Sequence, residues 1–205
     1  MNLAEIRCIF LDLGKVLVDL DLSLIGAHMQ KLSGVPPEKL REAAIGDGLA
    51  SVFETGRISE AEFHQEVCRR LRKEIGKDDF YTAWNSIFLP DPILPDEVVS
   101  NLAKKASLWA LSNTNSAHYG FLAGRYSFFR YFAGQILSFE AGLAKPDPRI
   151  FKYALDRAGA TAAGSLFVDD QAPNVEAARA AGIDAFQFLN PDQFIQEMRS
   201  RQLLE

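Results

Sequence analysis

Short apolar runs, each closed by polar residues or glycine, recur along the chain. They span Ile6–Leu11, Leu108–Leu111, Gln135–Phe139 and Leu166–Val168, and a fifth run covers Ala185–Leu189. Each run is too short for a helix, and most are apolar on both faces, as the buried strands of a parallel sheet are. The pattern therefore predicts a sheet of parallel strands.

Helical segments separate these predicted strands. Asp96–Lys105 follows a proline, Pro148–Ala158 begins with proline and ends before Gly159, and Ala172–Ala181 runs into Gly182. Proline in the first turn and glycine just past the last residue are typical helix boundaries. Strands that alternate with helices in this way predict an α/β fold, namely a doubly wound parallel sheet of the Rossmann-like kind.

One stretch, from about residue 21 to residue 88, breaks the alternation and reads as helices only. The predicted helices are Leu22–Leu32, Pro37–Ala44, Ser59–Ile75 and Asp78–Ile87. Ser59, followed three residues later by Glu62, is a capping-box signature for the third of them. We therefore expect an α/β core domain of residues 1–20 and 89–205, with a small all-helical cap domain of residues 21–88 inserted after the first strand.

Polar residues follow the predicted strands where each strand ends. They are Asp12, Ser112 with Asn113, Lys145, and Asp169 with Asp170. In open α/β sheets, ligands bind at the carboxyl ends of the strands. This set supplies a nucleophile, a hydroxyl, a cation and a pair of carboxylates that can bind Mg²⁺, which together suit phosphoryl transfer. The attacking oxygen must approach a phosphate dianion, and Mg²⁺ and the lysine neutralise its charge.

These motifs resemble those of the haloacid dehalogenase-like (HAD) superfamily, in its small-cap phosphatase branch. The matching pieces, in order, are FLDLGKVL around Asp12, LSNTN around Ser112, GLAKPDPRIF around Lys145 and FVDDQAPNVEAARAAG around Asp170. They cover the sheet domain and leave only the cap without a diagnostic motif. Each piece alone is a weak signal, and all four in order at strand ends make a strong one. The motifs are similar to those of bacterial glucose-1-phosphatase-like proteins, which also contain DLG, LSNTN, KP and DD.

The resemblance implies a magnesium-dependent phosphohydrolase that cleaves a small phosphomonoester, such as a sugar phosphate, through a phospho-aspartyl intermediate. It implies that Asp12 is both the nucleophile and a ligand of Mg²⁺. The carbonyl of Gly14 and the carboxylate of Asp170 would complete the protein's share of the metal site, with Asp169 close by or acting through water.

The same resemblance assigns the phosphate-binding residues. Ser112 would donate a hydrogen bond to the transferring phosphoryl group, helped by the backbone amide of Asn113 near a helix start. Lys145 would neutralise the charge of the nucleophile and of the phosphoryl oxygens. The cap would set specificity, and by analogy Glu54 and Arg57 of the predicted cap loop would face the site.

Gly14 departs from the usual pattern of the superfamily. Most of its phosphatases place a second aspartate at this position, where it protonates the leaving group and later activates water. Loss of such a positioned group costs roughly 10²–10⁴-fold in rate. The glucose-1-phosphatase-like branch has the same substitution, so Gly14 does not exclude activity. Asp19 and Asp21 are candidates to replace the acid, although turn and cap roles are the simpler interpretation.

Two alternatives stay open at this point. A 2-haloacid dehalogenase-type hydrolase also lacks the second aspartate and works without a metal, but such enzymes usually place an aromatic residue at the position of Gly14. The pair Asp169-Asp170 argues instead for a metal. A non-catalytic phosphometabolite-binding relative is the other alternative, which the loss at Gly14 permits.

Composition limits the partners and the compartment. The chain of 205 residues has a formal net charge of −5 and no run of Lys or Arg that could follow a phosphate backbone, so we expect no nucleic-acid partner. The first residues fit neither a signal peptide nor a membrane span. Cys8 and Cys68 have no metal-ligand spacing, and a reducing cytoplasm fits them best. The sequence does not indicate an oligomeric state.

Overall fold

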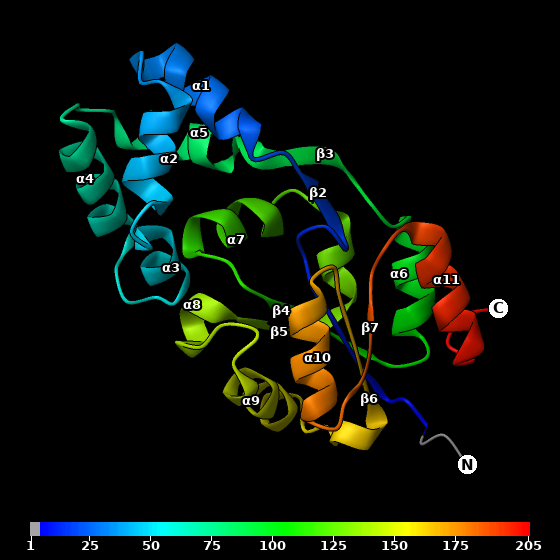
Figure 1. Ribbon diagram of the computed structural model, residues 1–205. Coiled ribbons are helices and arrows are strands. Elements are labelled where there is room, and N and C mark those ends of the chain that lie inside the picture. Colours follow the sequence, from blue (N-terminus) through cyan, green and yellow to red (C-terminus); the bar gives the residue numbers. More distant parts are fainter. Residues whose placement is uncertain (1–4) are drawn as a thin grey trace.

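A parallel sheet forms the centre of the protein. The computed structural model describes residues 5–205, in which five strands lie in the order β5-β4-β1-β6-β7 (Figure 1). Their bounds are β1 Cys8–Leu11, β4 Ser107–Ser112, β5 Phe132–Leu137, β6 Ser165–Asp169 and β7 Asp184–Gln187. Every adjacent pair of these strands is parallel. The predicted doubly wound parallel sheet is confirmed.

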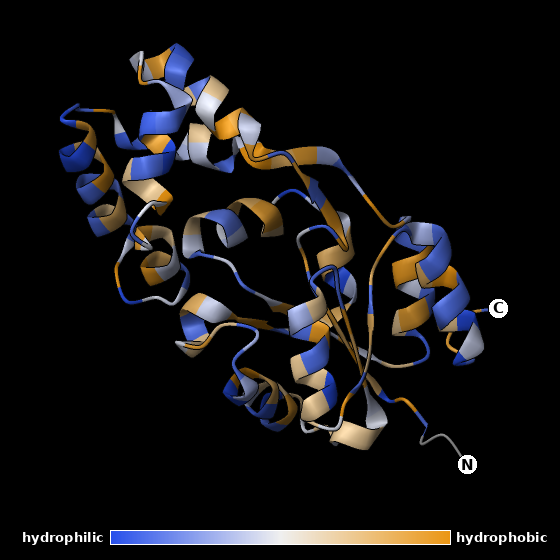
Figure 2. Cartoon of the chain, in the orientation of Figure 1, coloured by the Kyte–Doolittle hydropathy of each residue, from blue (hydrophilic) through white to orange (hydrophobic). Residues whose placement is uncertain are grey.

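Helices cover both faces of this sheet. Those packed on one face are α6 (Asp96–Ala103), α7 (Ser116–Ala123) and α11 (Pro191–Ser200), and those on the other are α9 (Pro148–Ala158) and α10 (Ala172–Ala180). Side chains along β1 point alternately to the two faces of the sheet. Ile9 and Leu11 therefore belong to the apolar cluster on one face, and Cys8 and Phe10 belong to the cluster on the other. Figure 2 shows the apolar strand residues enclosed by helices of mixed polarity.

Register in the centre of the sheet fixes the position of the site. Leu11 of β1 pairs with Ala110 of β4 and with Val168 of β6. Each strand then ends at a polar residue: Asp12 follows Leu11, Asp169 follows Val168, and Ser112 lies two residues after Ala110. These polar residues therefore emerge together at one edge of the sheet. The order of the strands reverses beside β1, so this edge is also the topological switch point at which open α/β sheets bind their ligands.

The segment between β1 and α6 contains a group of helices with its own apolar centre. They are α1 (Ser23–Ser33), α2 (Pro37–Ile45), α3 (Leu49–Glu54), α4 (Glu60–Leu71) and α5 (Lys77–Trp84), drawn in blue to teal in Figure 1. Phe63 stacks on Phe53 with ring centroids 4.6 Å apart and contacts Phe80 and Trp84 edge-on or at an angle. The cluster around these rings shares no fully buried residue with the two clusters of the sheet.

Two details of this segment differ from the prediction. Residues 49–54, predicted as loop, form α3, because Leu49 and Phe53 lie one helical turn apart and both are buried. The strands β2 (Val18–Leu20) and β3 (Phe88–Pro92) form an antiparallel pair at the two ends of the segment, which the prediction lacked. The capping box is confirmed, since Ser59 N donates to Glu62 Oε2 at 2.7 Å and Glu62 N donates to Ser59 Oγ at 3.3 Å.

The third predicted strand ends earlier than expected. β5 stops at Leu137, and Ser138–Ala141 forms the short helix α8. The hydroxyl of Ser138 donates to the carbonyl of Glu54 at 2.6 Å and accepts from Thr114 N at 2.9 Å, which turns the chain out of the sheet. The remaining elements are the short helices η1 (Asn85–Ile87), η2 (Ser127–Tyr131) and η3 (Ala162–Gly164). Across residues 5–205, the helices are too short or too polar to span a bilayer.

Candidate active site

A pocket of about 280 Å³ opens at the carboxyl ends of β1, β4 and β6. It is lined by Asp12, Gly14, Lys15, Leu20, Ser112, Asn113, Lys145, Asp170, Gln171 and Asn174. Six of the seven residues predicted from the sequence are in this lining. The seventh, Asp169, is completely buried next to it.

Lys145 lies at the centre of the polar groups. Its Nζ is 3.0 Å from Asp12 Oδ1 and 2.6 Å from Asp169 Oδ2, and it donates to the carbonyl of Leu111 at 2.8 Å. Burial alone would lower the pKa of Lys145, but the two carboxylates raise it above its ordinary value. The side chain is therefore a buried ammonium ion that carries its charge at neutral pH.

Asp169 holds that ammonium ion in place. Its carboxylate receives hydrogen bonds from Lys145 Nζ at 2.6 Å, Gln171 N at 2.8 Å and Asn174 Nδ2 at 2.9 Å. These three donors occupy both oxygens of a side chain that has no exposed surface. Gln171 and Asn174 were not predicted as site residues. The sequence signal that could have identified Asn174 is its position, five residues after Asp169 at the start of the next helix.

Asp12 presents a carboxylate that is almost removed from water. It is 7% exposed, and its Oδ1 accepts from the backbone N–H of Leu13 at 2.8 Å as well as facing Lys145. Burial raises the pKa of Asp12 to about 6, against the lowering effect of Lys145. The group is therefore largely ionised at neutral pH and poorly solvated, which suits an oxygen nucleophile.

Three carboxylates could hold a metal ion. One oxygen each of Asp12, Asp169 and Asp170 lies within 4.8 Å of the others. Asp170 is half-buried, and its pKa is raised by burial and by the neighbouring Asp169. An all-oxygen set of this kind fits a hard divalent cation such as Mg²⁺. Both oxygens of Asp169 already accept hydrogen bonds, whereas only Oδ1 of Asp12 is engaged among the described residues, so Asp12 and Asp170 are the direct donors that the geometry favours.

The loop after β4 links the two sides of the pocket. Ser112 is buried at the end of β4, and the side-chain amide of Asn113 donates to the carbonyl of Lys145 and accepts from its N–H, both at 2.8 Å. This two-way bond fixes the loop that carries Lys145. From the sequence, only a backbone role was expected for Asn113, because the partner of its side chain lies 32 residues further along the chain.

The missing second aspartate leaves an apolar wall. A Cβ atom at Gly14 would lie 3.1 Å from Cδ2 of Leu20, so Leu20 fills the space beside this position. Asp19 accepts from Lys15 at 2.5 Å, which lowers its pKa, and Asp21 accepts from the N–H of Ser23 at 2.9 Å. Asp21 thus has the cap role that was the simpler interpretation, Asp19 forms an ion pair with Lys15, and neither aspartate lines the pocket.

The predicted cap-loop residues do not reach the pocket lining. Glu54 is half-buried at the end of α3, where burial raises its pKa, and Arg57 donates to Thr55 Oγ1 at 3.0 Å. Their loop nevertheless packs against the sheet domain. Gly56 lies so close that an added Cβ would be 2.0 Å from the carbonyl oxygen of Phe139.

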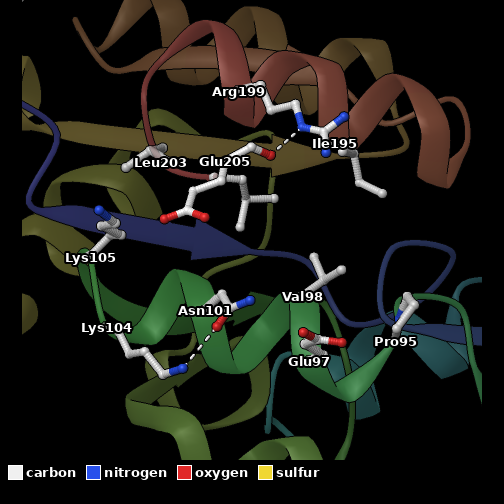
Figure 3. A pocket seen from close by; sticks show the side chains of 11 residues that line it. Pro95, Glu97, Val98, Asn101, Lys104, Lys105, Ile195, Arg199, Leu203 and Glu205 are labelled. Carbon is white, nitrogen blue, oxygen red and sulfur yellow. Dashed lines mark hydrogen bonds between the residues drawn. The ribbon is translucent and has the colours of Figure 1, made fainter.

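A second cavity, of about 480 Å³, lies between α6 and α11, away from the carboxylates (Figure 3). Two of its cations are already hydrogen-bonded: Lys104 to Asn101 at 2.9 Å and Arg199 to the carbonyl of Glu205. The pocket at the strand ends, which combines a buried nucleophile, a buried cation and metal-binding oxygens, is therefore the stronger candidate for catalysis.

Comparison with known proteins agrees with this arrangement. A HAD family enzyme from Bacteroides thetaiotaomicron, crystallised with magnesium and inorganic phosphate, matches with a TM-score of 0.82 and 28% identity, over 90% of this chain and 95% of that chain. A HAD-like family hydrolase from Porphyromonas gingivalis matches with a TM-score of 0.81 and 28% identity, over 98% of this chain and 100% of that one.

Sequence comparison gives the same family. D-ribitol-5-phosphate phosphatase of Bacteroides thetaiotaomicron is 25% identical over 199 residues, which cover 94% of this chain and 97% of the relative. The family model for haloacid dehalogenase-like hydrolases matches residues 6–182. The chain thus belongs to the haloacid dehalogenase-like hydrolase family, as its four motifs indicated.

Proposed function

We propose that this hydrolase is a magnesium-dependent phosphatase that cleaves a small phosphomonoester through a phospho-aspartyl intermediate on Asp12. The observation that carries the proposal is the buried carboxylate of Asp12, 3.0 Å from a Lys145 ammonium ion that Asp169 holds in place. The similarity to a D-ribitol-5-phosphate phosphatase supports the same reaction class.

In the first step, a carboxylate oxygen of Asp12 attacks phosphorus, and the bond from phosphorus to the leaving oxygen breaks. Lys145 neutralises charge on the nucleophile and on the phosphoryl oxygens. The Ser112 hydroxyl and the backbone N–H of Asn113 donate hydrogen bonds to the transferring group. Their rigid positions favour the attack because little reorganisation is needed during it.

In the second step, water attacks phosphorus and the bond from phosphorus to Asp12 breaks. Inorganic phosphate leaves, and the carboxylate is restored. Apart from Asp12 and Asp170, which are assigned to the attack and to the metal, the pocket lining has no carboxylate among the described residues that could replace the acid missing at Gly14. The leaving oxygen therefore takes its proton from water, and the rate depends on how well that oxygen stabilises negative charge.

Mg²⁺ is the proposed cofactor. Asp12, the carbonyl of Gly14 and Asp170 would hold the ion, and Asp169 would act indirectly by positioning Lys145. When bound, the ion supplies positive charge that offsets the approach of an anionic nucleophile to a phosphate dianion.

We further propose that residues 1–20 and 89–205 are the catalytic core domain and that residues 21–88 are a cap domain. The separate apolar cluster of α1–α5 supports this division, as does the β2–β3 pair at its two ends. A cap packed over the strand-end edge would exclude water from the pocket and limit the size of the substrate.

Hydrolysis of a panel of phosphorylated metabolites and an activated aryl phosphate, with and without Mg²⁺, tests the proposal. Magnesium-dependent release of inorganic phosphate is the expected result. Metal-independent release of halide from 2-haloacids would favour the dehalogenase alternative. Binding of phosphorylated metabolites without turnover of any panel member, the aryl phosphate included, would favour a non-catalytic relative.

A further inference from the structure

The proposed mechanism does not use one charged pair beside the pocket: Lys15 lines the pocket, and Asp19, just outside the lining, pairs with it at 2.5 Å. We propose that Lys15 and Asp19 bind hydroxyl groups of the leaving-group part of the substrate, so that the enzyme selects phosphates of polyols or sugars over phosphates of plain alcohols. The inference rests on the proposed phosphatase function and deepens it by assigning the residues that select this substrate class.

Once the other lining residues have been assigned, Lys15 and Leu20 are left to contact the leaving group. Asp12, Ser112, Asn113, Lys145 and Asp170 serve the phosphoryl group and the metal. The side chain of Asn174 is bonded to Asp169 at 2.9 Å, so it is already satisfied. Lys15 and Leu20 belong to the same lining and have no task in the phosphoryl transfer.

The backbone at Lys15 indicates that the site holds this residue in place. Its φ angle is 58°, a left-handed conformation that costs free energy for every residue except glycine. The N–H of Lys15 donates to the carbonyl of Val18 at 2.8 Å, which closes the tight loop after Gly14. A lysine in a position that glycine would occupy without strain points to a use for its side chain.

The pair has both donors and acceptors left over. Lys15 Nζ lies 2.5 Å from Asp19 Oδ1, and the same oxygen accepts from Leu20 N at 2.8 Å. Among the described residues, no hydrogen bond reaches Asp19 Oδ2, and two of the three N–H donors of Lys15 remain. A hydroxyl group both donates and accepts, so adjacent hydroxyls match this arrangement.

The charge of the pair disfavours leaving groups that carry a second phosphate or a carboxylate. The positive charge of Lys15 is offset by Asp19, so the pair offers no net charge for a second phosphate or a carboxylate. Both side chains are nearly half exposed, so a substrate in the pocket can reach them. Leu20 stands beside them, and its apolar side chain suits the carbon backbone of a polyol or sugar.

A matched pair of substrates tests the inference. One is a pentitol phosphate, and the other is n-pentyl phosphate, which has the same number of carbons and no free hydroxyl. The kcat/KM ratio of the two is measured for the wild type, for Lys15→Met, which keeps a side chain of similar length, and for Asp19→Asn. Lys152→Met, on the exposed face of α9, is the control.

The wild type should prefer the pentitol phosphate, and Lys15→Met should lower the kcat/KM ratio about tenfold or more, because hydrogen bonds from a charged group to the hydroxyls are lost. Asp19→Asn should lower it less, and Lys152→Met should leave it unchanged. An unchanged ratio in Lys15→Met overturns the inference, as does an equal loss on both substrates.

If the wild type turns over neither phosphate, their affinities are measured by calorimetry on Asp12→Asn protein, with and without Lys15→Met. The ratio of the two affinities then takes the place of the kcat/KM ratio, with the same expected and contradicting results. Turnover of an aryl phosphate reports the proposed function separately.

Discussion

The ammonium nitrogen of Lys145 lies 3.0 Å from Oδ1 of Asp12, and both side chains are almost entirely buried. Each charge makes the other tolerable away from water, so the nucleophile and its counter-ion form one unit. The site can therefore keep a reactive carboxylate ionised in a pocket that excludes most solvent.

Removal of the cation should damage both fold and activity. In Lys145→Met, Asp12 and Asp169 are left close together without a counter-ion, so we expect the free energy of unfolding to fall by about 3–5 kcal/mol. Phosphatase activity should fall roughly a thousandfold in the fraction that is folded, because the phosphoryl oxygens lose a preorganised cation. Urea unfolding and steady-state kinetics measure the two effects. Lys152→Met should change neither; a stable and active Lys145→Met protein would contradict the role of Lys145.

The raised pKa of Asp12 should make the metal-free protein less stable as pH rises. The folded-state pKa of about 6 exceeds the ordinary value of 3.8, so the folded protein binds more protons than the unfolded chain between these pH values. Stability is therefore greatest below about pH 4 with respect to this group, and it is lost as pH rises through about 6. Asp12→Asn has no such ionisation and should gain roughly 2 kcal/mol relative to wild type between pH 4 and pH 7.

Denaturant unfolding of both proteins in chelator, over this pH range, measures the difference. Added Mg²⁺ should remove much of it by stabilising the wild type through its ionised carboxylates. If the free energies of unfolding of the two proteins changed in parallel with pH in chelator, ionisation of Asp12 would not destabilise the fold, and the prediction would be wrong.

The two adjacent aspartates should fail in different ways. Asp170→Ala should weaken magnesium activation at least tenfold with little loss of stability, because Asp170 is half-buried and faces the proposed metal site. Asp169→Asn should instead destabilise the fold, because Asp169 fixes Lys145 at 2.6 Å and has no exposed surface. Magnesium titration of activity and thermal unfolding separate the two. Equal magnesium affinity in Asp170→Ala and the wild type would exclude Asp170 as a ligand.

Packing of the proposed cap against the sheet domain should depend on Gly56. Its φ is 66°, and an alanine Cβ would meet the carbonyl oxygen of Phe139 at 2.0 Å, so Gly56→Ala must displace the cap loop from α8. Gly34→Ala is a matched control, because its φ of 68° gives similar strain while nothing lies within 4 Å of the added atom. Both variants should lose stability, by about 1 kcal/mol for the control. Only Gly56→Ala should also lose about tenfold in kcat/KM; equal kinetics would mean that this contact does not position the cap.

The apolar wall at Gly14 should make the rate depend steeply on the leaving group. Aryl or anomeric phosphates should react faster than alkyl phosphates of similar size, since each pKa unit is worth up to about 1.4 kcal/mol of proton affinity. Gly14→Asp should flatten this dependence only together with Leu20→Ala, because Leu20 lies 3.1 Å from the new Cβ. Rates over esters of graded leaving-group pKa provide the test. A flat series in the wild type would mean that another group already donates the proton.

Most of the sheet and the strand-end residues could be predicted from the sequence. Buried parallel strands give short continuous apolar runs, and β1 and β6 are buried at every position. The polar residue after such a run is placed at the edge of the sheet by the parallel geometry alone, which is how Asp12 and Asp169 were found.

Local signals failed where distant contacts decide the structure. β5 ends just before Ser138, whose hydrogen-bond partner Glu54 lies 84 residues away in the chain, at the end of α3. The division of roles between the adjacent aspartates follows from which one faces Lys145, and no spacing rule gives that. The β2–β3 strands are short and one contains prolines, so their pairing leaves no periodic pattern.

Hydrolysis of an aryl phosphate by Asp12→Asn in saturating Mg²⁺ tests the central claim most directly. The substitution keeps the size of the side chain and removes the attacking charge. Our account predicts that release of inorganic phosphate falls to the uncatalysed background while circular dichroism shows an intact fold. A variant that keeps more than a tenth of the wild-type rate would remove Asp12 from the mechanism.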